Sequence, residues 1–443
     1  MFWIAFTFLF LLCFGLAFVK VDRWSGLLPP FRTIILIQSL LLFPYLIFWK
    51  LGLSGLHPDI QRAPNIMFSE DAAFVKYMIV QALSFVAMFV GYISKKEHVI
   101  SEGRGRPFFG DNLNSLLVFS LIFAIGAFAI KIQMVGGITN TLFYQLEDRV
   151  ELQKGTGYIS FVYEVGFYLA SFVCMKKLHD IPTIKNKIIA LIIILVASVA
   201  FSSFGGRKNT VFLIMSLLLY WNFSIQPIKR LRLYLIFVPV LLVSYSAIVL
   251  SIRDNGGASN KMVVNEQNHS VNPLVAILSN LSYVPQYVYI INCYSTDDYW
   301  LGRSFNDLAV AFLPSSLYPD KPPVDDGVYI RNHALGARFV PSTPAKKMEL
   351  TGWPPQTIGI GWINFGVFGV IFLSFIYGYL QKIFVSLAIQ SRNIGVIFVA
   401  VYSILNFQIS VLRIVQLISI TSVAYSISFI AGKAKFIFTQ RNR

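Results

Sequence analysis

The feature that most constrains this chain is a series of long apolar runs. Crossing the hydrocarbon core of a bilayer takes about 20 predominantly apolar residues in a helix. About eleven runs approach that length, at roughly 2–19, 27–48, 72–93, 113–132, 157–175, 188–204, 209–224, 233–252, 356–380, 394–411 and 414–432. They are continuously apolar and do not alternate with a period of two, which predicts helices. We therefore expect an all-α polytopic membrane protein with about eleven transmembrane helices.

The composition agrees with a membrane protein and excludes several other classes. Hydrophobic residues make up 56% of the 443 residues and charged residues only 13%, whereas a soluble protein carries about 25% charged residues. The net charge of +16 would suggest nucleic acid as the partner of a soluble protein. In a membrane protein it reflects basic cytoplasmic loops and contacts with anionic lipid. We expect membrane lipid, and no nucleic acid, among the partners.

Short-loop lysines and arginines predict the orientation, because they concentrate on the cytoplasmic side of a membrane. Most of them fall on one side, in the segments 20–23, 95–106, 176–187, 229–232, 382–392 and 433–443. This side is taken as cytoplasmic. The N-terminus is then on the outer side of the membrane and the C-terminus is cytoplasmic. The first apolar run lacks a basic n-region and a small-residue cleavage site, so we expect it to remain as an anchor.

This topology divides the chain into three parts. Residues 1–252 hold the first eight spans, 253–355 form a large outer-face loop or cap, and 356–443 hold the last three spans and a basic cytoplasmic tail. Within the cap, the apolar stretch 273–293 is interrupted by Pro285, which predicts a re-entrant or interfacial helix. The stretch 314–355 is dense in Pro, Arg and Asp and is expected to be an ordered lid without regular structure.

Motif searches exclude the common soluble enzymes. The sequence contains no P-loop, dinucleotide fingerprint, HExxH, GxSxG or CxxC. Adjacent acids at 297–298 and 325–326 resemble a metal-binding DxD only loosely, and adjacent carboxylates in a loop are usually solvated. We expect no metal site and no cofactor.

Arginines at the predicted outer ends of helices are the main candidates for a binding site. Positive residues are disfavoured on that side, and a guanidinium matches phosphate oxygens through forked hydrogen bonds. The candidates at helix ends are Arg149, Arg207, Arg253 and Arg413, while Arg331 and Arg338 flank His333 in the cap. The alternative for each is that it reaches lipid headgroups or pairs with a nearby acid such as Glu147, Asp148, Glu151, Asp254 or Glu349. For the group as a whole, anion binding is favoured.

The cap also supplies candidate bases and stacking residues. His333 can take a proton from a hydroxyl near neutral pH, and Glu349 can do so if burial raises its basicity. The alternative is that both are ordinary surface residues. Aromatic residues suited to stacking on sugar rings are Trp300, Tyr318, Tyr329, Trp353 and Trp362, although aromatic side chains also gather at any membrane interface.

Three short strings resemble motifs of bacterial oligosaccharide repeat-unit polymerases, the Wzy-type O-antigen polymerases. Phe204-Gly205-Gly206-Arg207 resembles their small-residue-plus-Arg turn, and Pro314-Ser-Ser-Leu-Tyr-Pro319-Asp-Lys321-Pro322 resembles their outer-loop Pro…Lys-Pro motif. Ile360-Gly-Trp-Ile-Asn364-Phe365-Gly366-Val-Phe-Gly369 resembles their Asn-Phe-Gly-x-x-Gly string, which begins the span after the large loop. The chain departs from the pattern at Ile360, where many members carry a glutamate. The resemblance therefore carries no catalytic acid to that position.

The resemblance implies a GT-C-like membrane glycosyltransferase. Such an enzyme transfers a growing glycan from undecaprenyl diphosphate onto a lipid-linked oligosaccharide repeat unit, in O-antigen or similar surface polysaccharide synthesis. It acts at the outer face of a bacterial inner membrane, so the resemblance implies a periplasmic N-terminus and a cytoplasmic C-terminus. Candidate catalytic residues are then Arg207, His333 and Glu349. Candidate diphosphate- or substrate-binding residues are Arg149, Arg253, Arg331, Arg338, Arg413 and Lys321. Expected partners are the undecaprenyl-diphosphate-linked oligosaccharide, a chain-length regulator and a flippase.

Other functions remain open at this point. An O-antigen ligase shares the lipid-linked donor, and another lipid-linked glycosyltransferase would use the same chemistry. A lipid-linked oligosaccharide transporter would instead be expected to show internal repeats and charges near the middle of the membrane. Lys76 and Lys131 lie nearer the ends of their runs. A structural membrane protein without a ligand would leave the arginines unexplained.

Overall fold

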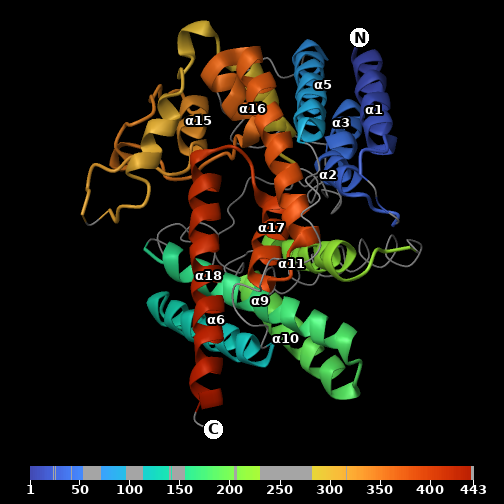
Figure 1. The fold of residues 1–443 in the computed structure, drawn as a ribbon. Coiled ribbons are helices and arrows are strands. Elements are labelled where there is room, and N and C mark those ends of the chain that lie inside the picture. The colour runs from blue at the N-terminus through green and yellow to red at the C-terminus, as the bar shows by residue number, and fades with distance from the viewer. Residues whose placement is uncertain are drawn as a thin grey trace.

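The computed structural model describes residues 1–22, 24, 26–40, 42–52, 71–95, 113–138, 141, 155–203, 207–229, 282–315 and 317–440. Every regular element in these ranges is helical (Figure 1), which agrees with the predicted all-α architecture. The apolar elements are α1 (Phe2–Phe18), α2 (Pro30–Ser39), α3 (Leu42–Lys50), α5 (Asp71–Ser94), α6 (Leu113–Met134), α9 (Gly157–Asp180), α10 (Ile184–Ser202), α11 (Arg207–Tyr220) with η2 (Trp221–Ile225), α16 (Gln356–Gln390), α17 (Ile394–Asn406) and α18 (Val411–Gln440).

Seven stretches of the described residues are long and apolar enough to cross a membrane. They are Pro30–Lys50, Asp71–Ser94, Leu113–Met134, Gly157–Asp180, Ile184–Ser202, Gln356–Gln390 and Val411–Lys433. Three apolar helices are shorter: Phe2–Phe18, Asn209–Ile225 and Ile394–Asn406. The chain is thus an α-helical protein of multi-pass membrane character. Each of these helices falls on an apolar run of the sequence. The remaining run, 233–252, lies outside the described residues, so the total of eleven spans stays a prediction.

The helices pack in two groups that α17 and α18 join. In the first group α5 packs along α16, and α1 packs against α5 and α2. In the second, α6 pairs with α9, which also contacts α10, and this group crosses the lower half of the molecule (Figure 1). α18 runs from the cap to the C-terminal end and contacts α6, α9 and α17. Segments distant in sequence therefore meet around the first turns of α18.

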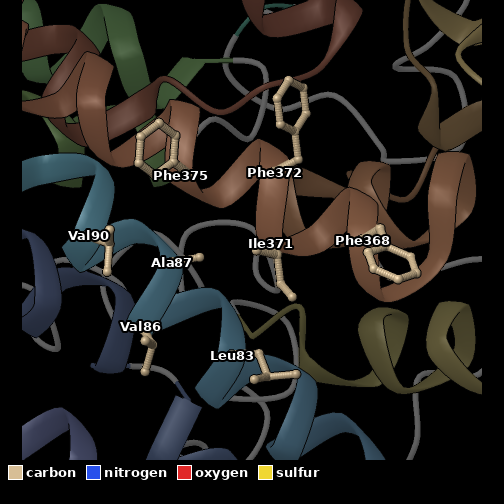
Figure 2. A pocket seen from close by; sticks show the side chains of 8 residues that line it. All are labelled: Leu83, Val86, Ala87, Val90, Phe368, Ile371, Phe372 and Phe375. Atoms are coloured by element: carbon tan, nitrogen blue, oxygen red, sulfur yellow. The ribbon is translucent and has the colours of Figure 1, made fainter. Parts of the chain in front are cut away.

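Glycines bring α5 and α16 into close contact. A Cβ atom on Gly91 would overlap the backbone of Phe375, and one on Gly378 would overlap the backbone of Met88. Small residues allow this approach of two helix backbones, as is common between membrane helices. Beside the contact lies a wholly apolar groove of about 560 Å³, lined by Leu83, Val86, Ala87, Val90, Phe368, Ile371, Phe372 and Phe375 (Figure 2).

α16 is two helices joined at a sharp bend. The backbone of Phe365 and Gly366 is not helical, and Gly366 has φ of 60° and ψ of −141°, a conformation that requires glycine. The two halves then pack on each other, because a Cβ on Gly369 would overlap the carbonyl oxygen of Gly361. The Asn364 side chain donates to the carbonyl of Ile360 over 2.9 Å. The Asn-Phe-Gly-x-x-Gly string is therefore the sequence of this bend.

The stretch predicted to form a re-entrant or interfacial helix contains the helix α14 (Val284–Cys293). It has ten residues, too few to cross a membrane, and it packs between α5, α3 and the first half of α16. Most of its residues are buried. Residues 273–281 of the predicted segment lie outside the described residues.

The cap, defined here as residues 294–355, contains more regular structure than predicted. The stretch 314–355 was expected to be a lid without helices, but it holds α15 (Gly327–Ala334) and the 3-10 turn η5 (Ala345–Lys347). The prediction was wrong because burial of Val328, Tyr329 and Ile330 in the cap stabilises a helix between its proline-rich flanks. The cap also contains the 3-10 elements η3 (Thr296–Asp298) and η4 (Arg303–Ala309).

One buried ion pair fixes the end of the bundle opposite the cap. Lys382 Nζ lies 2.7 Å from Asp22 Oδ1, and the two side chains are only 5% and 6% exposed. The same carboxylate accepts hydrogen bonds from the Tyr92 hydroxyl and the Phe31 N–H. Asp22 thereby holds the α1–α2 connection against α5 and α16.

The first prediction concerns this pair. Lys382→Met should lower the free energy of unfolding by about 3–5 kcal/mol, because it leaves a buried carboxylate without its counter-ion. The control is Lys50→Met, which breaks a 2.7 Å pair with Asp71 whose side chains are 28% and 46% exposed and should cost at most about 1 kcal/mol. Thermal unfolding of the detergent-solubilised proteins measures both. Equal losses would contradict the stabilising role of the Asp22–Lys382 pair.

The second prediction concerns the bend of α16. Gly369→Ala should destabilise the protein by about 1–3 kcal/mol, because the new methyl group meets backbone that cannot move aside. Gly126→Ala in α6 is the matched control, since no atom lies within 4 Å of a Cβ at Gly126. It should be neutral or stabilising by up to about 1 kcal/mol. The idea fails if both variants melt at the wild-type temperature.

Candidate functional site

An aromatic core holds the cap together and encloses His333. The imidazole stacks on Tyr294, with ring centroids 4.5 Å apart, and its Nδ1 lies 2.6 Å from the Tyr289 hydroxyl. The other ring nitrogen, Nε2, is buried and has no hydrogen-bond partner. Burial lowers the pKa of His333 below its ordinary value of 6.5, so the neutral imidazole is favoured. In this conformation the candidate base faces the interior of the cap.

The aromatic residues proposed for sugar stacking are mostly part of that same core. Trp300, Trp353 and Trp362 are at most 6% exposed, and Tyr329 is fully buried. The Tyr329 hydroxyl donates to the buried Asp307 over 3.0 Å. Only Tyr318 is exposed among the five. The sugar-stacking expectation is therefore wrong for the buried four, because their rings are used in packing.

The charged candidates of the cap have protein partners. Arg331 Nη1 lies 3.4 Å from Glu349 Oε2, whose side chain is 62% exposed. Arg338, 78% exposed, lies 3.6 Å from Asp298. The Lys321 ammonium donates to the carbonyls of Ala311 and Leu313 over 2.6 and 2.7 Å. The Pro…Lys-Pro string thus forms a turn that Lys321 stabilises. Arg331, Arg338 and Lys321 each bind a different partner in the cap and do not converge on one site.

Three candidates cannot be placed. Arg149 and Arg253 lie outside the described residues, as do residues 204–206 of the Gly-Gly-Arg string. Arg207 is the first residue of α11, but the structure does not describe its side chain. The roles given to these residues stay predictions.

Arg413 is the sequence candidate that lies between the cap and the bundle. It is the third residue of α18, and Ser410 caps that helix by accepting from the Arg413 N–H over 3.4 Å. The guanidinium donates to Gln416 over 2.7 Å. No described carboxylate lies within ion-pair distance of it. A cation in the first turn of a helix opposes the helix dipole, so two positive features coincide here and together attract an anion.

The surroundings of Arg413 come from three parts of the fold. Its charge acts on Tyr287 of α14, Tyr402 of α17 and Asp325 of the cap. The cap contacts α18 at this point through an apolar cluster of Ala311, Val411 and Val415. We call Arg413, Tyr287, Tyr402, Asp325 and Glu164 the subcap cluster.

Glu164 is the functional candidate that the sequence reading missed. It lies on α9, and its charge acts on Tyr402 and is opposed by that of Lys131 on α6. Lys131 is 4% exposed and donates to Ser160 over 2.8 Å. Glu164 is the sole acidic residue within the described apolar helices, apart from Asp71 and Asp180 at helix ends. That position inside an apolar run was the available signal, since ionisable residues within membrane helices usually have a function.

Two acidic residues of the cap, Asp325 and Asp326, contribute to the electrostatic environment at the start of α18. Asp326 is 2% exposed and accepts from the Val411 N–H over 3.1 Å at the start of α18. Burial raises its pKa well above the ordinary value. Burial also raises the pKa of Asp325, an effect that the Gly327 N–H and Arg413 partly offset. These carboxyls therefore hold protons more readily than exposed ones.

The subcap cluster combines groups with complementary chemistry. A guanidinium binds an oxyanion and stabilises charge that develops on it. A carboxyl group within reach of the same region can accept or deliver a proton. A group-transfer reaction with an anionic leaving group needs both functions in one place. No group of three or more His, Cys, Asp or Glu side chains suited to a metal ion occurs among the described residues.

Comparisons with known proteins add no further information: the chain matches no family model, no curated protein and no solved structure.

The third prediction is a pH dependence that comes from His333. Because its pKa is lowered in the folded protein, His333 contributes stability that is present above about pH 6.5 and is lost as the pH falls below that value. Between pH 7.5 and 5 the His333 contribution lowers the melting temperature, while the raised pKa values of Asp325 and Asp326 act in the opposite direction. His333→Gln should remove the first effect alone and so change the slope. Melting curves at a series of pH values provide the measurement. A slope identical in the variant and the wild type would show that the imidazole is not held neutral.

Proposed function

We propose that this protein is a membrane glycosyltransferase of the oligosaccharide repeat-unit polymerase type. It transfers a growing glycan from undecaprenyl diphosphate onto a lipid-linked repeat unit, as in the synthesis of O-antigen or a similar surface polysaccharide. The observation that carries the proposal is the subcap cluster: Arg413 lacks a carboxylate partner among the described residues, its charge acts on Asp325, and both Arg413 and Glu164 act on Tyr402.

The chemistry of the reaction matches this arrangement. The glycosidic bond to the diphosphate breaks as the acceptor hydroxyl attacks the anomeric carbon. The diphosphate leaves with the bonding electron pair, and Arg413 stabilises its negative charge without requiring a proton. The acceptor hydroxyl loses its proton to a carboxylate, for which Glu164 and Asp325 are the candidates in the subcap cluster. His333 and Glu349 remain candidates from the sequence.

A separate observation, the apolar groove, supports a lipid-linked substrate. The groove between α5 and α16 is lined by apolar side chains, of which Phe368 and Phe372 are exposed (Figure 2). In a bilayer such a surface contacts hydrocarbon chains. An isoprenoid chain is a suitable occupant in an enzyme whose donor and acceptor are both lipid-linked.

The proposal includes location and partners. Eleven spans in a GT-C-like arrangement, with the N-terminus periplasmic and the C-terminus cytoplasmic, put the cap on the outer face of a bacterial inner membrane. The lipid-linked oligosaccharide meets the enzyme there after a flippase has moved it across. A chain-length regulator would act on the same complex.

Transport of a lipid-linked oligosaccharide is a second candidate, and Glu164 with Lys131 favours it. Paired ionisable residues within membrane helices occur in proton-coupled transporters. A strain lacking the gene separates the two functions. A polymerase defect abolishes the polysaccharide ladder but leaves single-repeat products capped on the cell surface. Loss of every capped product would instead indicate ligation or transport and would overturn the polymerase proposal.

The fourth prediction tests Arg413 in that strain. Complementation with Arg413→Lys keeps the positive charge but removes the forked geometry. A charge-assisted hydrogen bond contributes about 1.5–3 kcal/mol, so the elongation rate should fall on the order of ten- to a hundredfold and the ladder should shorten. The matched control is Arg392→Lys, an exposed arginine in the α16–α17 loop, which should restore the full ladder. A full ladder from Arg413→Lys at equal protein abundance would exclude the diphosphate role.

A further inference from the structure

One face of α5 carries both a cation and the apolar groove. Between Ala72 and Val90 the exposed residues of this helix recur every three or four positions, which places them on a single face. We call this set the α5 stripe: Ala72, Lys76, Ile79, Leu83, Val86 and Val90. Lys76 is the one charged residue of the stripe, and Leu83, Val86 and Val90 line the groove.

Two contacts fix the place of the Lys76 ammonium. Its Nζ donates to the carbonyl of Ile291, in the last turn of α14, over 2.7 Å. It also lies 5.1 Å from the centre of the Trp362 ring in α16. The hydrogen bond uses one of the three N–H donors of the ammonium group. No described carboxylate lies within ion-pair distance of Lys76, and Asp71 of the same helix pairs with Lys50.

The ammonium lies beyond the cap end of the groove. Figure 2 shows that the groove runs from Leu83 and Phe368 at one end to Val90 and Phe375 at the other. The bend of α16, to which the cap is attached, comes directly before Phe368. Lys76 precedes Leu83 by seven residues, which is close to two full turns and about 10 Å along the helix axis.

This arrangement matches a lipid with an anionic phosphate at the end of its chain. Lys76 is five residues from the first residue of α5, or about 7.5 Å along the axis, which is the region where lipid headgroups meet a membrane helix. An exposed lysine on a membrane helix is costly in hydrocarbon and is stabilised by an anion. The groove continues from that level toward the middle of the helix and offers contact to hydrocarbon only.

Lys95, at the other end of α5, does not share this relation to the groove. It follows Gly91 by four residues, and a Cβ on Gly91 would overlap the backbone of Phe375. Lys95 is therefore on the face of α5 that touches α16, and its Nζ lies 5.4 Å from the centre of the Tyr379 ring. Of these two lysines, Lys76 is the one on the α5 stripe.

We propose that Lys76 and the groove form the binding site for the acceptor lipid, with its diphosphate on the ammonium and its first isoprene units between α5 and α16. The inference rests on the proposed function, which needs two lipid-linked substrates at once. The donor diphosphate leaves, and Arg413 is assigned to it. The acceptor diphosphate stays intact and only has to be held. A lysine supplies that charge without the forked geometry of an arginine.

Photolabelling locates the lipid directly. The probe is a farnesyl diphosphate analogue with a diazirine at the end of its chain, added to the full chain in phosphatidylcholine nanodiscs. Mass spectrometry of the labelled protein should find the probe on residues 83–90 or 368–375. An excess of unlabelled farnesyl diphosphate should prevent the labelling. Labelling that falls wholly outside these two segments would overturn the inference.

Lys76→Met should lower the labelling of these segments about tenfold at limiting probe, because a hydrogen bond to a charged group is lost. Lys95→Met is the matched control, the same change on the other face of the same helix, and should label like the wild type. Equal labelling of Lys76→Met and the wild type would overturn the inference.

Val86→Trp tests the groove without touching the lysine, and it decides the matter if Lys76→Met does not fold. The indole fills the groove, so labelling of the two segments should again fall. Val118→Trp on α6 is the control, since Val118 is 53% exposed and Val86 42%, and it should leave the labelling unchanged. Full labelling of Val86→Trp would show that the chain does not lie in the groove.

The remaining outcomes separate this site from the proposed function. Arg413→Lys should keep the groove labelling, because that arginine is assigned to the other lipid, and loss of the labelling would overturn the assignment of two sites. Nanodiscs enriched in phosphatidylglycerol should also keep it. If they prevent it, the site takes ordinary anionic phospholipid and the inference fails. Full labelling of Lys76→Met with a shortened ladder in Arg413→Lys overturns this inference alone. Labelling as expected in a protein whose gene deletion removes every capped product overturns the polymerase function, and the acceptor role with it.

Discussion

The bend in α16 is the constraint on which the rest of the structure depends. Breaking a helix frees backbone groups, and within or beside a membrane these must find partners in the protein. Here the freed carbonyls of Ile363 and Asn364 accept from the N–H groups of Trp300 and Leu301. The Asn364 side chain accepts from the Gly302 N–H over 2.9 Å. The cap is thus attached to the bundle by the hydrogen bonds that the bend requires, and the place of the cap follows from them.

The charged residues at the two ends of the helix bundle differ in the partners that they have. At one end, Lys382 has a carboxylate at 2.7 Å and is almost fully buried. Beneath the cap, Arg413 has Gln416 as its hydrogen-bond partner, and no described carboxylate lies within ion-pair distance of it. Burying a charge is costly unless it is closely paired. The close pairing of Lys382, and the absence of a described carboxylate partner for Arg413, are the contrast on which the proposed ligand role of Arg413 is based.

Sequence reading predicted much of the fold but little of the site. Long apolar runs determine membrane helices because the bilayer requires them, so α5, α9 and α16 were found where expected. α15 was missed, since its stability comes from burial of Tyr329 and its neighbours rather than from a periodic pattern. At the site, the sequence did not show which group each side chain contacts. Composition cannot show that Lys321 caps two carbonyls, that Glu349 pairs with Arg331, or that Trp353 is buried in the cap.

The Asn-Phe-Gly-x-x-Gly string illustrates how a motif and a function can be separated. Each of its fixed residues has a structural explanation: Gly366 adopts a conformation closed to other residues, Gly369 permits close packing, and Asn364 holds the cap. None of these roles involves a substrate. A resemblance based on this string is therefore evidence for a shared bend and cap attachment, and the chemistry needs separate grounds. The grounds proposed here are those of Arg413 in the first turn of α18, where the cap contacts the bundle.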